Sequence, residues 1–513
     1  MRDTVRTKAT FEPVGSSQVV FPATHHRPAW YHLALPFHER RALLFIGDLL
    51  FLAAAGAATI EARSLLQDPR LLTPQLQDAQ ILWLSFLSAM WMGLGIVNEC
   101  YSARITAHPM KILSGLMITA VEVGLLYLLI FFFFGREVFL SSVTRTWLAS
   151  FVLRNPLPRV SPGVFLAVSW ILIACWRLVC LKLFTSNLFR RKALIVGAGR
   201  SGCTVARIVR ETVEDYELIG FVDDEPEKQG LLIDGLQVLG NRYDLLRLAQ
   251  VHGANEIILA TTQNIHKDLF NSLMTAYELG IAVKPMALLS EELLGRVPVE
   301  HLGQDWFLAS CWNNAAMPTF YRTFKRLVDI VLSLIGLSVL AVLLPFITIA
   351  IYLDSPGSIF YTQERVGKGG KIFKVIKFRS MIPDAEEKQE PVWAVKGDPR
   401  ITRIGNFIRR IRLDEAPQFL NILKGEMSIV GPRPERPQFV EDLQQRIPFY
   451  RARLCAKPGL TGWAQVKYHY GSTVEEAAIK LQYDLYYAKH QSFMLDLLII
   501  LRTVRIMLTM KGT

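Results

Sequence analysis

Hydrophobic residues gather in long stretches in the first third of the chain and give way to shorter patterns further on. Four stretches approach the roughly 20 residues that an α-helix needs to cross a bilayer. They cover residues 42–60, 81–97, 113–134 and 164–181. The pattern therefore predicts a four-helix transmembrane region over residues 41–186, after an N-terminal cytoplasmic tail of residues 1–40.

Basic residues indicate the orientation of this region. Arg40 and Arg41 precede the first stretch and Lys182 follows the last, so the positive-inside rule places both flanks in the cytoplasm. No apolar stretch follows a basic start in the tail, so we expect the first helix to direct insertion without a cleavable signal peptide. The connection 135–163 conflicts with the rule, because it must lie outside and carries Arg136, Arg145, Arg154 and Arg159.

Charged residues interrupt the apolar stretches at Asp48, Glu122 and Arg177. An ionisable group inside a membrane is costly and commonly functional. We favour a structural interpretation, in which the acids pair within the helix bundle and Arg177 extends its guanidinium toward the interface.

After the last long stretch, short apolar strands alternate with helical patterns. An apolar run at 193–196 leads into the turn Gly197-Ala-Gly199-Arg-Ser-Gly202, and a helical stretch follows over 203–210. Strand, glycine turn and helix form the context that the dinucleotide-binding fingerprint requires. Gly197 and Gly199 would let backbone N–H groups approach a phosphate at the start of the helix.

Further strands are predicted at 218–222, 256–260 and 281–285, with a helix over 267–279 between the last two. We therefore expect residues 187–300 to form one Rossmann-like parallel α/β domain. Asp223 follows the second strand, about where a ribose-binding acid would sit.

The glycine turn is weak support for catalysis, because one fold hosts many functions. No Ser-x-x-x-Tyr-x-x-x-Lys pattern of the short-chain reductases follows it. We therefore favour a structural or regulatory nucleotide-binding module over redox chemistry.

One more apolar run follows a connector of residues 301–324. It begins after Lys325 and Arg326 and contains Pro345. A single crossing would place all later residues outside the cell, where nucleotide-sugars are absent. Because proline removes a helix hydrogen bond and clashes with the preceding turn, we expect a kinked, re-entrant helix over 326–353. An ordinary spanning helix with a tolerated proline is the alternative.

Composition narrows the function classes. The chain is 51% hydrophobic and carries 57 Lys and Arg against 45 Asp and Glu, a net charge of +12. Together with the membrane stretches, this charge favours an anionic membrane surface or a phosphorylated substrate over nucleic acid. Six scattered cysteines without a Cys-x-x-Cys pair indicate neither zinc nor a disulfide framework.

Residues 325–513 hold the candidate chemistry. A carboxylate can attack phosphorus as a covalent nucleophile, which Asp414 would do, and the neighbouring Glu415 would hold Mg2+ with substrate phosphate. Arginine grips phosphate oxygens with a planar fork. The candidate phosphate ligands are Lys377, Arg379, Arg409, Arg412 and Arg433. A solvated salt-bridge surface is the alternative interpretation of this cluster.

A series of motifs in this region resembles the polyprenyl-phosphate glycosyl-1-phosphate transferases of the monotopic type. The membrane helices and the α/β domain ahead of it resemble the large bacterial subgroup in layout only. The matching motifs are Phe324-Lys-Arg-Leu-Val-Asp329, Gln363-Glu-Arg-Val-Gly367, residues 371–381, Leu413-Asp-Glu415, residues 423–434, Pro458-Gly-Leu-Thr-Gly-Trp-Ala-Gln-Val466 and Tyr483-Asp-Leu-Tyr-Tyr487.

The resemblance implies a catalytic domain that moves a sugar-1-phosphate from a UDP-sugar to undecaprenyl phosphate and releases UMP. Asp414 would carry the phosphosugar between two steps, Glu415 would position Mg2+, and Arg409 and Arg433 would bind phosphate. The product would initiate exopolysaccharide, capsule or O-antigen synthesis at the inner membrane, with the catalytic domain facing the cytoplasm.

The chain departs from the family at the helix break, where the family has a Ser-Pro pair and this chain has Leu344 before Pro345. Residues 493–510 predict an interfacial amphipathic helix, with packing on the chain's own domain or a dimer contact as alternatives. We expect membrane lipids and a second copy of the chain as partners, and no nucleic acid.

Two rival functions and the sugar stay open at this point. The rivals are a membrane-anchored nucleotide sensor and a nucleotide-sugar dehydratase or reductase that uses the Gly197 turn. After Val466 the chain reads Lys-Tyr-His-Tyr-Gly, where members that use N-acetylated sugars often have Asn-Gly-Arg. This difference favours glucose or galactose.

Overall fold

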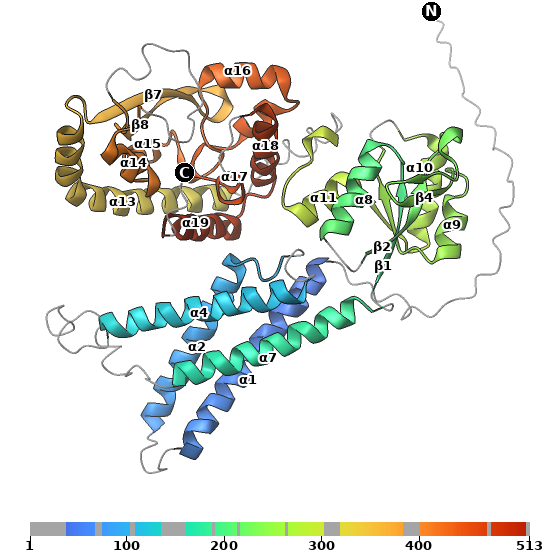
Figure 1. The fold of residues 1–513 in the computed structure, drawn as a ribbon, viewed down its shortest axis with the longest axis horizontal. Helices are drawn as coiled ribbons and strands as arrows, with labels where there is room; N and C mark the ends of the chain where they lie inside the picture. Colours follow the sequence, from blue (N-terminus) through green and yellow to red (C-terminus); the bar gives the residue numbers. More distant parts are fainter. Residues whose placement is uncertain are drawn as a thin grey trace, which may run out of the picture.

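The computed structural model describes residues 37–66, 74–102, 108–134, 161–186, 190–212, 216–261, 265–301, 319–382, 400–468 and 473–508. Three parts follow one another along the chain: long apolar helices, an α/β domain and a C-terminal domain (Figure 1). Several predictions lie outside the described residues. They concern most of the N-terminal tail, the four arginines of the third connection, most of the connector, and the residues from 469 to 471.

Each of the four predicted apolar segments lies in a helix. The helices are α1 (Phe37–Leu66), α2 (Pro74–Val97), α4 (Pro109–Phe134) and α7 (Ser161–Phe184). All four, and α13 (Thr319–Asp354), are long and apolar enough to cross a membrane. Leu52, Trp91, Phe165 and Ile173 are fully buried in a core that the four helices share. Many large apolar side chains on their outer faces remain exposed, as lipid contact requires. The chain is a membrane protein.

Two of the charges inside these helices, Asp48 and Arg177, pair with each other, whereas Glu122 pairs with Arg505 near the C-terminus at 3.2 Å and not within the helix bundle. Arg177 donates from Nε and NH2 to the two oxygens of Asp48, at 3.0 and 2.5 Å, and from NH1 to the carbonyl of Cys100 at 3.0 Å. Tyr101 also donates to Asp48 at 2.8 Å. The pairing interpretation is therefore confirmed for Asp48, whereas Arg177 is buried on that acid and does not extend toward the interface.

The α/β domain is built around a six-stranded sheet of order β3-β4-β2-β1-β5-β6. All neighbours pair in parallel except β3 and β4, which form an antiparallel pair at one edge. The strands are β1 (Arg191–Val196), β2 (Tyr216–Val222), β3 (Leu232–Ile233), β4 (Leu236–Gly240), β5 (Glu256–Leu259) and β6 (Ala282–Pro285). The predicted parallel domain is present, but the edge strand β3 and its neighbour β4 were not predicted.

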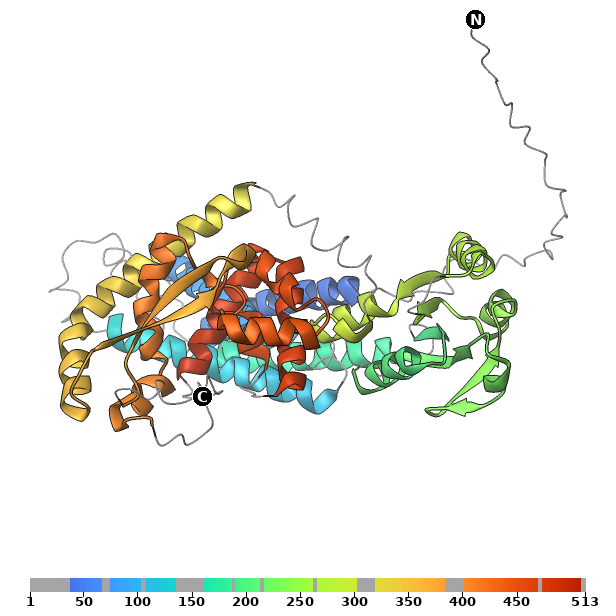
Figure 2. The same cartoon turned by 90° about the horizontal axis from the view of Figure 1, so that it is seen from above.

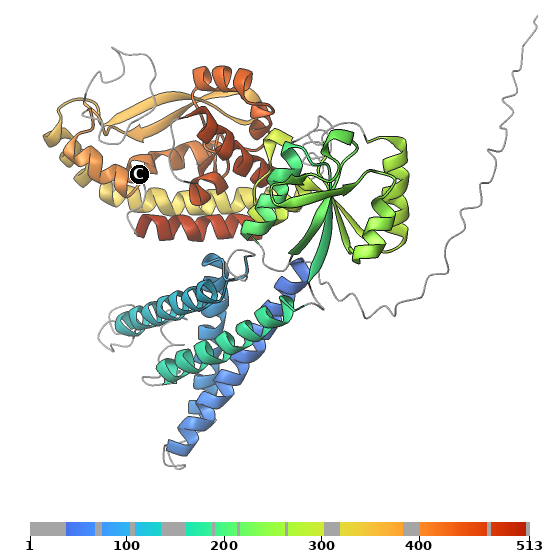
Figure 3. The same ribbon diagram turned by 45° about the vertical axis from the view of Figure 1, so that its right-hand side comes forward.

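Helices cover both faces of this sheet (Figure 3). One apolar core lies between the sheet and the helices α8 (Arg200–Thr212) and α11 (Met286–Leu294). A second core lies between the opposite face and the helices α9 (Leu245–His252) and α10 (Lys267–Glu278).

The C-terminal domain surrounds the hairpin of β7 (Phe360–Val366) and β8 (Ile372–Phe378) and the parallel pair of β9 (Ser428–Val430) and β10 (Gly459–Thr461). Its helical elements after α13 are η6 (Lys368–Gly370), α14 (Arg403–Arg410), η7 (Leu413–Gln418), α15 (Phe419–Lys424), α16 (Pro437–Arg446), η8 (Tyr450–Cys455), α17 (Trp463–Lys467), α18 (Val474–Lys489) and α19 (Phe493–Leu508). Helix α19 lies beside α13 (Figures 1 and 3), where Phe493 contacts Phe324.

Helix α13 is continuous and contains Pro345. It bends sharply in its second half (Figures 1 and 2), as expected of a proline that removes a helix hydrogen bond. Leu340, Ile347 and Ile351 form a buried cluster with Phe378 and Ile408. The bent half is therefore supported by the domain that follows it.

Ion pairs join the three parts. Glu99, in the turn between α2 and α4, binds Lys467 of α17 and lies 2.8 Å from the guanidinium of Arg502 on α19. Glu291 of α11 binds Lys489 at 2.8 Å and His490 at 2.6 Å, at the end of α18.

Candidate active site

The two predicted catalytic acids lie on η7, a short 3-10 helix. Arg412, directly before η7, has a left-handed backbone with φ 56°. The chain therefore changes direction after α14, and the next residues turn toward the interior of the domain. Asp414 is 8% exposed and Glu415 is 6% exposed. This burial contradicts the alternative of a solvated salt-bridge surface.

Glu415 is surrounded by cations from three separate segments. Its Oε1 accepts hydrogen bonds from Lys377 Nζ at 3.0 Å and from Arg433 NH2 at 2.7 Å. Its Oε2 lies 3.8 Å from Arg412 NH1. Burial alone would raise the pKa of Glu415, but Arg433, Lys377 and Arg412 hold this pKa well below its usual range. Glu415 is therefore ionised and fixes the cations beside Asp414.

Asp414 has a different environment although it is the next residue. Burial, followed by repulsion from the Glu415 carboxylate, raises the pKa of Asp414 to about 6, while Lys377, Arg409 and Arg433 oppose the increase. Within the described segments, no group donates a hydrogen bond to the Asp414 carboxylate. Its lone pairs are therefore available for attack on an electrophile.

The other predicted phosphate ligands divide into two groups. Arg409, at the end of α14, acts electrostatically on Asp414, so it belongs to the same site as Lys377, Arg412 and Arg433. Arg379 lies elsewhere. Its guanidinium donates to the carbonyls of Ser355 and Pro356, directly after α13, and thus joins β8 to the end of that helix.

Lys325 and Arg326 anchor α13 to the C-terminal domain. Arg326 donates to the carbonyls of Ile422 and Leu423, at 2.6 and 2.7 Å, near the end of α15. Lys325 donates to Asp496 of α19 at 2.8 Å. Carbonyls at a helix end lack partners within the helix, so this arginine stabilises α15 as well as α13.

In the α/β domain, the glycine turn is tightly packed. A Cβ atom at Gly202 would lie 2.0 Å from the carbonyl oxygen of Gly197, whereas one at Gly199 would meet open space. Asp223 accepts from the backbone N–H of Ala198 at 2.6 Å. Asp223 is therefore bonded to the backbone of the glycine turn in this structure. Nucleotide binding by these residues stays a prediction.

The acidic pair suits a cation that arrives with a substrate. Across the described ranges, no group of three or more His, Cys, Asp or Glu residues could hold a metal ion. Mg2+ commonly uses one or two carboxylates together with substrate phosphates. Lys377 and Arg433 both donate to Oε1 of Glu415, and Oε2 accepts no hydrogen bond from the described residues, so this oxygen can still accept such a ligand.

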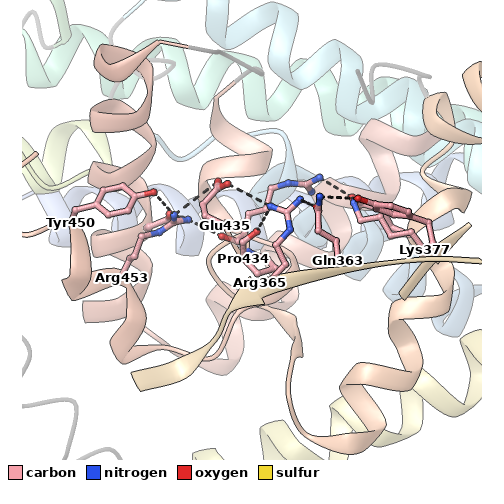
Figure 4. Close-up of polar contacts among 11 residues, drawn as sticks. Gln363, Arg365, Lys377, Pro434, Glu435, Tyr450 and Arg453 are labelled. Carbon is pink, nitrogen blue, oxygen red and sulfur yellow. Dashed lines mark hydrogen bonds and ion pairs between the residues drawn. The ribbon is translucent and has the colours of Figure 1, made fainter. Parts of the chain in front are cut away.

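A second polar network extends from the acidic pair and was not predicted. Figure 4 shows the labelled side chains in one row, from Tyr450 and Arg453 through Glu435 and Arg365 to Lys377. A small cavity beside this row is lined by residues including Val366, Gly367, Pro432, Arg433, Glu435 and Arg453. Arg365 and Lys377 lie in the motifs 363–367 and 371–381, and Glu435 directly follows the motif 423–434, but no motif marked the segment of Tyr450 and Arg453.

Comparisons with known proteins agree with this geometry. Residues 320–510 match the family model described as bacterial sugar transferase, and residues 97–268 match one described as CoA-binding domain. A putative undecaprenyl-phosphate N-acetylgalactosaminyl 1-phosphate transferase of Bacillus subtilis (strain 168) is 56% identical over 134 residues, which are 26% of this chain and 74% of that protein.

Two longer matches cover more of the chain. A UDP-N-acetylgalactosamine-undecaprenyl-phosphate N-acetylgalactosaminephosphotransferase of Aeromonas hydrophila is 40% identical over 230 residues, 45% of this chain but only 53% of that enzyme's length. A UDP-galactose-lipid carrier transferase of Erwinia amylovora is 28% identical over 464 residues, 83% of this chain and 94% of that protein. The chain belongs to the bacterial sugar transferase family, as its motifs predicted.

Proposed function

We propose that this protein transfers a sugar-1-phosphate from a UDP-sugar to undecaprenyl phosphate, releases UMP, and thereby initiates the synthesis of a bacterial polysaccharide. The observation that carries the proposal is the difference between Asp414 and Glu415, the neighbouring acids on η7. There, the buried Asp414 carboxylate accepts no hydrogen bond from the described residues and lies among cations that its neighbour Glu415 fixes. The names of the relatives, which include undecaprenyl-phosphate phosphotransferases, support the same chemistry.

The reaction would proceed in two displacements at one phosphorus atom. In the first, a carboxylate oxygen of Asp414 attacks the sugar-linked phosphorus, and the bond to the bridging oxygen breaks, so that UMP leaves with the electron pair. In the second, a phosphate oxygen of undecaprenyl phosphate attacks the same phosphorus and the bond to Asp414 breaks. A covalent nucleophile divides one difficult transfer into two easier ones.

The cations would stabilise the charge that develops on the phosphoryl oxygens. Arg433 and Lys377 already point to one oxygen of Glu415, and Arg409 lies near Asp414. Fixed cations in a site of low dielectric stabilise a transition state without reorganisation. Bound Mg2+ would neutralise the diphosphate, with Glu415 as its protein ligand.

We further propose that α13 is re-entrant in the bacterial inner membrane, so that the active site lies at the cytoplasmic face. The sharp bend of this helix and the anchoring of its first half through Lys325 and Arg326 support this arrangement. A site at the interface suits a carrier whose phosphate stays at the surface while its prenyl tail stays in the bilayer. The homodimer stays a prediction.

The proposal is tested by UMP release from membrane-embedded protein with undecaprenyl phosphate, Mg2+ and a panel of UDP-sugars. The parent protein should release UMP with at least one donor, and Asp414→Asn should lose essentially all of this activity, because an amide is not a nucleophile toward phosphorus. Asp442→Asn is the matched control, since Asp442 forms an exposed pair with Arg446 on α16. Equal UMP release by Asp414→Asn and the parent would exclude Asp414 as the nucleophile.

The same panel identifies the sugar. We propose glucose or galactose, because the residues after Val466 differ from the Asn-Gly-Arg of members that use N-acetylated sugars. The relatives name both N-acetylgalactosamine and galactose. UMP release with N-acetylated UDP-sugars alone would overturn this part of the proposal.

A further inference from the structure

The segment that carries Arg433 depends on outside donors to hold its backbone. Gly431-Pro-Arg-Pro-Glu435 contains two prolines, which lack the N–H groups needed to join a regular hydrogen-bond ladder. Each of its last four carbonyls accepts from another segment. The donors are Gly459 N to Pro432 O at 2.9 Å, Arg453 NH2 to Arg433 O at 2.9 Å, Arg365 NH1 to Pro434 O at 3.1 Å and Val366 N to Glu435 O at 2.9 Å.

Arg453 is the donor that fixes Arg433 itself, and it is buried. Its side chain is 7% exposed and forms an ion pair of 2.7 Å with Asp484 of α18, whose side chain is 2% exposed. The NH1 group donates to Tyr450 at 2.9 Å, so the guanidinium is held from both ends (Figure 4). A planar group with five donors can make these contacts at once, which a lysine ammonium cannot do in the same geometry.

We propose that Arg453 and Asp484 form a positioning pair that sets Arg433 against Glu415 and, through it, against the donor diphosphate. The NH2 group of Arg453 contacts both the Asp484 carboxylate and the carbonyl of Arg433, whose own guanidinium reaches Glu415 at 2.7 Å. A series of contacts therefore links α18, which is remote from the acids, through Arg453 to Arg433, the cation proposed to bind phosphate. This inference rests on the proposed function, because it assigns Arg433 to the donor.

A double-mutant cycle tests this role. Arg453→Lys should lower kcat on the order of tenfold to a hundredfold, because a displacement of about 1 Å can cost this much, and should change KM for the UDP-sugar much less. In an Arg433→Lys background the same substitution should cost about twofold or less, because residues that act as a unit are non-additive. Arg446→Lys, in the exposed pair with Asp442, is the control and should change neither constant.

Equal losses in both backgrounds would overturn the proposal, since a general structural defect does not depend on Arg433. Asp484→Asn, which keeps the shape of the side chain and removes its charge, should reproduce the loss in kcat. Failure of the parent protein to release UMP would reject the proposed function instead.

Hydrogen exchange gives a readout without activity. In Arg453→Lys the amides of Gly459 and Val366, which donate to this segment, should exchange faster while those of α18 stay protected. Unchanged exchange at both amides would also overturn the positioning role.

Discussion

The two neighbouring acids on η7 differ in what ionisation does to the folded protein. The pKa of Asp414 is raised to about 6 by burial and by Glu415, so the folded state binds this proton more tightly than the unfolded chain. Such a group stabilises the fold below its ordinary pKa and loses that contribution as the pH rises through about 6. The pKa of Glu415 is depressed by Arg433, Lys377 and Arg412, so its contribution is present at neutral pH and is lost in acid.

We therefore predict opposite effects of the two acid-to-amide substitutions on stability. At pH 7.5, Asp414→Asn should leave the free energy of unfolding unchanged or raise it by about 1–3 kcal/mol, because it removes an unfavourable charge. Glu415→Gln should lower it by about 3–5 kcal/mol, because Lys377, Arg433 and Arg412 lose their counter-ion. Thermal unfolding of both variants in nanodiscs measures the difference. Equal destabilisation of the two would contradict the assigned charge states.

The pH dependence of the rate follows from the same group. An attacking carboxylate must be ionised, so kcat/KM for the UDP-sugar should fall about tenfold per pH unit below about pH 6 and level off above it. Initial rates of UMP release between pH 5 and 8 measure this profile. A flat profile over that range would show that Asp414 has an ordinary pKa in the free protein.

At the scale of elements, the bend of α13 sets the direction of the residues that follow this helix. Pro345 cannot donate to the carbonyl four residues earlier, and the bent half packs on Phe378 and Ile408 of the C-terminal domain. The serine that precedes this proline in the family is Leu344 here, which packs against the same cluster. In this chain, apolar packing supports the bend.

We predict that Pro345→Ala straightens α13 and reduces access to the following turn from the cytoplasm. A cysteine at the exposed Ser358 should react with a membrane-impermeant maleimide from the cytoplasmic side in the parent, with the exposed Cys175 and Cys455 replaced by serine. Labelling should drop severalfold in Pro345→Ala. Leu344→Ser, which keeps the proline, should label like the parent. Labelling of the parent only from the periplasm would overturn the re-entrant arrangement.

At the scale of the whole molecule, one turn of the membrane region is docked on the C-terminal domain. Glu99 has a left-handed backbone with φ 59° and lies between Lys467 and Arg502, while the cations of both lie over the ring of Trp463. The indole of Trp463 donates to the carbonyl of Gly295 in the α/β domain at 2.9 Å. All three parts of the chain therefore meet at Trp463.

We predict that Glu99→Lys weakens this docking, because it places a third cation beside Lys467 and Arg502. Hydrogen exchange should become at least severalfold faster in α17 and α19 and stay unchanged in the sheet of the α/β domain. Glu278→Lys, on the exposed end of α10, is the control for the change in net charge. Unchanged protection of α17 and α19 would show that apolar packing alone holds the parts together.

The sequence by itself determined the apolar segments, the order of strand, glycine turn and helix, and the residue types at Asp414 and Glu415. Helix and strand periods depend on local hydrogen-bond geometry, and motif chemistry depends on residue type, so both can be read along the chain. The strand β3 was missed because its two residues are too few to show a period of two residues. The strand β4 has such a period, since Leu236, Val238 and Gly240 are buried, and was overlooked.

Only the tertiary structure decided which groups meet. It placed Arg177 on Asp48, moved Arg379 away from the acids to the end of α13, and brought Arg453 and Asp484 behind Arg433. It also separated the pKa values of Asp414 and Glu415, which are adjacent in the sequence. Burial and the approach of charges from distant segments set these properties, and neither follows from a local pattern.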